Sequence, residues 1–105
     1  MEDKWIIPLD ISNKYQPLIS VVIKNYKPFE YAVTLKILDG NTSTDVIRWD
    51  NINHPDHLDK FYKFKDSKKH LKSSIGKISN LNDVTELCDY IDKNHKRMIE
   101  NYFKR

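Results

Sequence analysis

The chain has 105 residues, 39% of them hydrophobic, which is enough for one domain with a single modest core. Folding at this size buries only roughly two thirds of the unfolded surface, so a large internal ligand cavity would be costly. A net charge of +3 is too small to indicate nucleic-acid binding by itself, and the two glycines exclude a glycine-rich phosphate loop.

The cysteine content and the N-terminus indicate a cytoplasmic protein. The single Cys88 cannot form an internal disulfide, and it falls on the apolar stripe of a predicted helix, where we expect a small buried hydrophobe. Residues 1–5 contain no basic segment followed by an apolar run, so no signal peptide is expected. No apolar stretch approaches the ~20 residues of a membrane span, so we expect no membrane contact.

The first predicted elements are an arm and a strand. Residues 1–17 are predicted to form an N-terminal arm or a short edge strand, with Pro8 and Pro17 as breaks. Residues 18–24 are rich in β-branched side chains and lie between two prolines. That composition predicts a strand.

A hairpin follows within a predicted antiparallel sheet that spans residues 18–65. Apolar and polar side chains alternate over residues 31–38, the Asp-Gly pair at 39–40 is typical of a tight turn, and residues 44–49 form the partner strand. Residues 60–65 are predicted to add a further strand, whose lysines would protect an exposed edge of the sheet from other chains.

The chain is predicted to close with a long helix. Residues 66–80 form a lysine-rich connection, and residues 81–103 carry the helical spacing of apolar side chains. Asp83, with Glu86 three residues later, resembles an N-terminal cap. The apolar stripe consists of Val84, Leu87, Cys88, Ile91, Met98, Ile99 and Tyr102, with His95 filling its gap.

The order of strands first and helix last predicts an α+β fold for a single domain, residues 1–105. We expect an antiparallel β-meander of about four strands packed against one long C-terminal α-helix, because the helix stripe supplies the apolar surface that the sheet must bury.

Titratable side chains gather between the strand 44–49 and the segment 60–65. Histidine exchanges protons near neutral pH, and a carboxylate can orient it, so His54 and His57 with Asp50 could transfer protons. Arg48 and Lys60 could hold a phosphate. This set is the minimum for metal-independent cleavage of RNA through its 2′-hydroxyl, and its catalytic candidates are Arg48, Asp50, His54 and His57.

Other interpretations of the same residues remain open. His54 and His57 could bind a metal, with Asp50, Asp56 or His70 as third ligand, or they could lie in a solvated loop. Arg48 could form a cross-strand ion pair with a carboxylate, which is the more common role of a strand arginine. Asn51 is typical of strand ends and turns, and Trp49 is most simply a core or interface aromatic, so both are expected to support the site.

A basic block covers residues 60–80, where seven lysines and one aspartate give +6, whereas residues 1–59 have −3 and residues 81–105 balance. Phe61, Tyr62 and Phe64 lie among the lysines, and such interleaving is typical of single-stranded RNA contact. The alternative is a solvated edge strand, and an exposed edge also permits a homodimer. The candidate RNA-binding residues are Lys60, Lys63, Lys65, Lys68 and Lys69.

Three short motifs carry a family resemblance: Asp39-Gly40, then Arg48-Trp49-Asp50-Asn51, then His54-Pro55-Asp56-His57. With these motifs the chain resembles, over roughly residues 31–103, the small TumE-like toxins found beside helix-turn-helix antitoxins. The second histidine cluster of that family has no full counterpart here, because residues 61–65 read Phe-Tyr-Lys-Phe-Lys and His70 lies downstream.

The resemblance implies a toxin-like protein with an antitoxin partner, and it extends to Arg48, Asp50, Asn51, His54 and His57. We therefore expect a toxin that acts on RNA or on translation without a cofactor or a metal. Whether it is an enzyme stays open. The alternative is a non-enzymatic module of the same fold that binds protein or nucleic acid.

Overall fold

In the computed structural model, the described residues are 2–10, 14–51, 57–60 and 78–104, and only the backbone is described for 57–60 and for 104.

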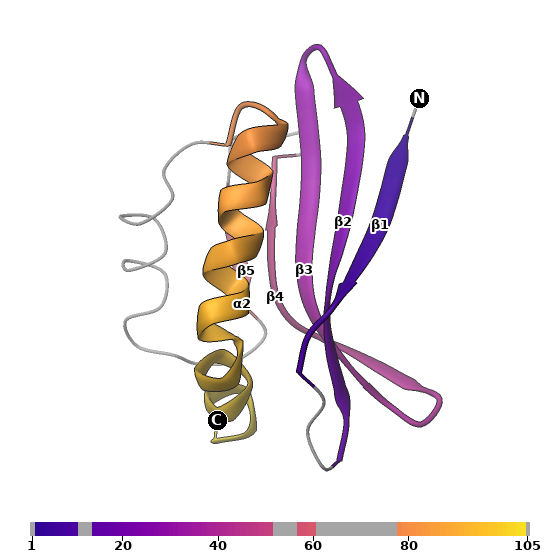
Figure 1. Cartoon of the computed structure of the whole chain (residues 1–105), viewed down its shortest axis with the longest axis vertical. Helices are drawn as coiled ribbons and strands as arrows, with labels where there is room; N and C mark the ends of the chain where they lie inside the picture. The colour runs from indigo at the N-terminus through magenta and orange to yellow at the C-terminus, as the bar shows by residue number, and fades with distance from the viewer. Residues whose placement is uncertain (1, 11–13, 52–56, 61–77, 105) are drawn as a thin grey trace.

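The described chain forms one antiparallel sheet and one long helix, so the predicted α+β fold is confirmed (Figure 1). The strands lie side by side in chain order, which makes the sheet a meander. Residues 1–17 were predicted to form an arm or a short edge strand, and the structure has the edge strand, so the described sheet has five strands. The elements are β1 (Asp3–Pro8), β2 (Gln16–Tyr26), β3 (Phe29–Asp39), β4 (Thr42–Asp50), β5 (His57–Lys60) and α2 (Leu81–Lys104).

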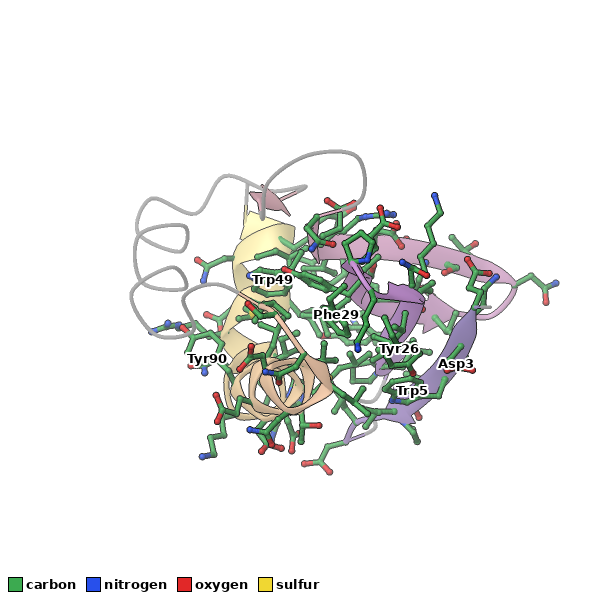
Figure 2. The ribbon with its side chains drawn as sticks, turned by 90° about the horizontal axis from the view of Figure 1, so that it is seen from above. Asp3, Trp5, Tyr26, Phe29, Trp49 and Tyr90 are labelled. Carbon is green, nitrogen blue, oxygen red and sulfur yellow. The ribbon has the colours of Figure 1, made fainter. Side chains whose placement is uncertain are left out.

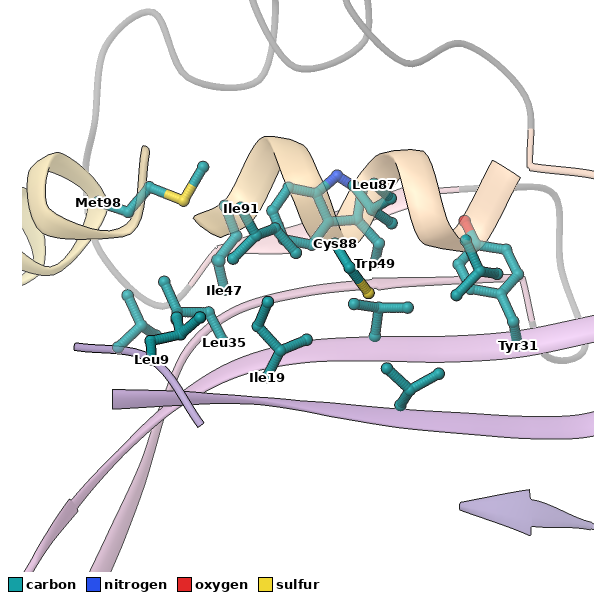
Figure 3. Packing of buried hydrophobic residues seen from close by; sticks show 14 of the residues in the cluster. Leu9, Ile19, Tyr31, Leu35, Ile47, Trp49, Leu87, Cys88, Ile91 and Met98 are labelled. Carbon is teal, nitrogen blue, oxygen red and sulfur yellow. The ribbon is translucent and has the colours of Figure 1, made fainter. Parts of the chain in front are cut away.

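Strand alternation gives the sheet two different faces. The helix face is the side against which α2 packs, over β2, β3 and β4, and the side chains there are apolar (Figure 3). Its members are Ile19, Val21, Ile23, Tyr31, Val33, Leu35, Ile37, Ile47 and Trp49. The far face is the opposite side, and it carries small, polar and charged side chains. Its central members are Ser20, Val22, Ala32, Thr34, Lys36, Arg48 and Asp50.

One extra residue interrupts the pairing of β3 with β4. Leu35 pairs with Ile47 and Lys36 pairs with Asp45, so Val46 has no partner of its own in the ladder and forms a β-bulge. Val46 is nevertheless fully buried. A second irregularity lies in β2, between Ile23 and Asn25.

The cap of α2 differs from the prediction. Asn80, not Asp83, is the N-cap, because its side-chain oxygen accepts a hydrogen bond from the Asp83 amide at 2.9 Å. The Asp83 carboxylate in turn accepts from the Ser79 amide at 2.8 Å. Asp83 therefore lies in the first turn, where its negative charge also favours the helix dipole.

Two polar side chains of α2 lie in the interior. Cys88 is buried, as predicted, and burial, with a further contribution from the Asp89 carboxylate, raises the pKa of its thiol to about 11. His95 is 4% exposed, and its Nδ1 donates to the Asp92 carbonyl at 2.6 Å. Its buried Nε2 makes no hydrogen bond. Both side chains therefore act as core residues.

Candidate functional site at the end of strand β4

An ion pair on the far face marks the end of β4. Arg48 and Asp50 are two residues apart on one strand, so their side chains project from the same face. The guanidinium Nε donates to Oδ2 of Asp50 at 3.0 Å, and Nη2 lies 2.9 Å from the same oxygen in the ion pair. Asp50 is only 6% exposed, whereas Arg48 is half-buried. The alternative considered for Arg48 was an ion pair with a carboxylate of a neighbouring strand, whereas the carboxylate that it contacts belongs to its own strand.

Small residues of β3 make room for this pair. Ala32 lies opposite Asp50 and Thr34 lies opposite Arg48, and both are buried. Directly opposed residues of antiparallel strands share a face, so a larger side chain at either position would compete for the space of the ion pair. Sequence reasoning did not identify these two residues. The signal was the small side chains at alternate positions of the predicted strand 31–38.

Asn51 fixes the end of β4 by hydrogen bonds to the neighbouring strand. Its Oδ1 accepts from the Tyr31 amide at 2.9 Å, and its Nδ2 donates to the Phe29 carbonyl at 2.8 Å. Its backbone amide also donates to the Tyr31 carbonyl, at 3.3 Å. The side chain thus extends the ladder by one more step, as expected for a residue that ends a strand.

Trp49 lies on the other side of the sheet from Arg48 and Asp50. It is buried in the core on the helix face, in the cluster that also contains the helix residues Leu87 and Cys88 (Figure 3). Trp49 therefore supports the end of β4 through packing and does not line the far face. This agrees with the expectation that Trp49 is a core aromatic.

The backbone of β5 places two further candidates. His57 pairs with Asp50, so position 57 belongs to the far face beside the ion pair. Lys60 pairs with Ile47, a residue of the helix face, so the register does not bring position 60 beside Arg48. The strand also begins earlier than expected, since His57 was assigned to the loop and is instead the first residue of β5.

Other candidates lie outside the described residues. These are His54 and the lysines Lys63, Lys65, Lys68 and Lys69, together with Asp56 and His70 of the alternative metal site. Among the side chains that the structure does describe, no three of the histidine, cysteine, aspartate and glutamate residues gather as metal ligands would. In the same part of the chain, no helix is both long and apolar enough to cross a membrane.

The comparison with family models is decisive for classification only. The model named Domain of unknown function (DUF7718) matches residues 1–105, the whole length of the chain. The chain belongs to this family. No curated protein and no solved structure matches it. Family membership assigns no activity, so the chemistry of the site has to be argued from its own residues.

Proposed function

We propose that this member of the DUF7718 family is a toxin-like protein that acts on RNA through Arg48, Asp50 and His57. The observation that carries the proposal is the register of β4 with β5, in which His57 is opposite Asp50 and two residues from the position facing Arg48. This register assigns three groups to adjoining positions of the far face: a base, a carboxylate that can orient it, and a guanidinium. The resemblance to TumE-like toxins involves the same residues.

The chemistry that we propose is cleavage through the 2′-hydroxyl of RNA. His57 takes the proton of that hydroxyl, the oxygen attacks the adjacent phosphorus, and the bond to the 5′-oxygen breaks. His54 returns a proton to the leaving oxygen, and the product is a 2′,3′-cyclic phosphate. Asp50 orients the His57 ring, and Arg48, which uses Nε and Nη2 for Asp50, offers Nη1 to the phosphate.

The direct test is cleavage of a labelled single-stranded RNA by purified protein in the presence of EDTA. We expect the wild type to yield ends with a cyclic phosphate, and His57→Ala to lose at least about a hundredfold in rate, the usual contribution of a general base. Lys96→Ala, an exposed residue of α2, is the matched control and should retain full activity. A wild type that leaves every RNA intact would contradict the enzymatic step.

Growth on induced expression tests the toxin-like role independently. Wild type should arrest growth, and the triple variant Arg48→Ala, His54→Ala, His57→Ala should not, although circular dichroism shows it to be folded. A helix-turn-helix antitoxin that covers the far face should relieve the arrest. The role also assumes a cytoplasmic protein. Arrest by the triple variant would remove these residues from the proposal.

The lysines of residues 60–69 are proposed to bind the RNA backbone. Each contact with a phosphate releases counterions, so the affinity should fall steeply between low and moderate salt. Replacing Lys63, Lys65 and Lys68 together by alanine should flatten that dependence. Binding that does not respond to salt would exclude these contacts.

One observation favours a second function, a non-enzymatic binding module. Arg48 is engaged by a buried carboxylate, which is also the arrangement of a purely structural ion pair. The double variant Arg48→Leu, Asp50→Leu separates the two functions, because a structural pair can be replaced by apolar side chains without loss of fold. Retained growth arrest or retained partner binding in this variant favours the module, and its loss in a folded variant favours the enzyme.

A further inference from the structure

Strand β1 exposes large apolar side chains on both faces of the sheet. It lies at the end of the strand order, on the side of the molecule away from α2 (Figures 1 and 2). Trp5, on the helix face, is 37% exposed, and Ile6, on the far face, is 63% exposed. A partner that docked on one face would cover only one of them. A strand that paired with the edge of β1 would shield both.

The edge of β1 that no other described strand pairs with, here called the free edge, has its own pattern of donors and acceptors. The Leu9 amide donates to the Pro17 carbonyl at 3.0 Å, so the amide of residue 9 points toward β2. Amides alternate in direction along a strand, and those of Ile7 and Trp5 therefore also point toward β2. The N–H and C=O groups of Lys4 and Ile6 point to the free edge, and Pro8 offers only its carbonyl there.

We propose that β1 pairs antiparallel with β1 of a second copy of this chain, across a two-fold axis at Ile6. The two Ile6 residues then exchange a pair of backbone hydrogen bonds, and the two five-stranded sheets become continuous. Both α2 helices lie on the same face of the joined sheet. This inference does not depend on the proposed function.

The charges and the apolar residues of β1 select this register. Residues opposite each other must share a face, so the two-fold axis has to pass through a residue. An axis at Lys4 would oppose two lysines. An axis at Trp5 would place Lys4 opposite Ile6. The axis at Ile6 opposes Ile6 to Ile6 and Trp5 to Ile7, and it leaves Lys4 opposite Pro8, so the two exposed apolar side chains, Trp5 and Ile6, each have an apolar partner. An axis at Ile7 would confine the pairing to residues 6–8 of β1 and would leave Trp5 without a partner in the strand.

Sedimentation over about 10 to 200 µM protein tests the dimer, because an interface of this small area is expected to be of micromolar affinity. Ile6→Pro removes only an amide that points away from β2, so the sheet should stay intact and the dissociation constant should rise at least about tenfold. Phe103→Ser, at another exposed apolar position, is the matched control and should leave it unchanged.

Crosslinking defines the register and does not rely on the proline variant. Single cysteines at positions 4, 5, 6 and 7 are treated with a short bis-maleimide, while the native Cys88 is buried and its raised pKa keeps it unreactive. We expect the dimer band to be strongest at position 6. A wild type that is monomeric throughout the concentration range, a dimer indifferent to Ile6→Pro, or a maximum at another position would overturn the proposal.

Discussion

The two faces of the sheet are built by different rules. The helix face is a continuous layer of apolar side chains closed by α2, and each of its members is defined by packing. On the far face, a charged pair lies among small residues, and its members are defined by specific contacts. One strand, β4, contributes to both faces, because Trp49 packs in the core while Arg48 and Asp50 project from the far face.

The largest expected difference between the faces comes from two neighbouring residues of β3. Leu35 is fully buried on the helix face, and Leu35→Ala should lower the free energy of unfolding by about 3 kcal/mol through lost burial and a cavity. Lys36→Ala on the far face should cost less than about 0.5 kcal/mol, because its ion pair with Asp45 is partly exposed. Urea denaturation measures both, and equal losses would refute the distinction.

The burial of Cys88 predicts that the free energy of unfolding depends on pH. The pKa of Cys88 rises from 9.0 to about 11 on folding, so the neutral thiol is favoured in the folded state. The associated stability is complete below pH 9 and is lost as the pH rises through 11, by about 2 kcal/mol at most, because solvent partly screens the charge of the thiolate. Denaturation at pH 8, 10 and 11 should show this loss in wild type. Cys88→Ala is the control, and an identical slope in that variant would contradict the prediction.

On the far face, the predicted loss of stability depends on whether one or both members of the Arg48–Asp50 ion pair are removed. Arg48→Ala leaves the Asp50 carboxylate buried without its guanidinium and should cost about 2 kcal/mol, less than for a fully buried pair because the arginine side chain is 37% exposed. The double variant Arg48→Leu, Asp50→Leu should recover at least about half of that loss. A double variant that is less stable than the single one would show that charge itself is needed there.

The smallest expected effect lies at the end of β4. Asn51→Ala removes two side-chain hydrogen bonds to β3 and should cost about 1 kcal/mol. Because the Tyr31 amide donates to Asn51 Oδ1, hydrogen exchange at Tyr31 should become faster while exchange at Val33 stays unchanged. Unaltered exchange at Tyr31 would mean that the side chain is not what closes the ladder.

The helix face could be predicted because the spacing of apolar residues along the strands and the helix is enough to identify it. Alternating residues such as Val33 and Leu35, and the stripe that contains Leu87 and Ile91, indicate burial without any knowledge of the partners. The site could be predicted only in part. Arg48 and Asp50 were identified as candidates, but their mutual ion pair depends on rotamers and on Ala32, which no pattern in the sequence connects to them.

The helix cap shows a similar limit. Asn80 and Asp83 are both good capping residues, and which of them begins the helix is decided by where the chain turns toward the sheet. The sequence pattern favoured the later residue, because the apolar stripe starts at Val84. An edge strand was one of the two predictions for residues 1–17, but its register with β2, which decides the faces of Trp5 and Ile6, did not follow from the sequence.

Val46 controls which groups β4 shows to solvent and which to the core. If Val46 took a ladder partner of its own instead of bulging, the register would slip by one residue and every side chain that follows it would turn to the opposite surface. Trp49 would turn outward, and the charges of Arg48 and Asp50 would meet the hydrophobic layer beneath α2. Deletion of Val46 would by contrast leave Asp45 and Ile47 in regular alternation, so the bulge is what allows two consecutive residues, Val46 and Ile47, both to be buried in the core.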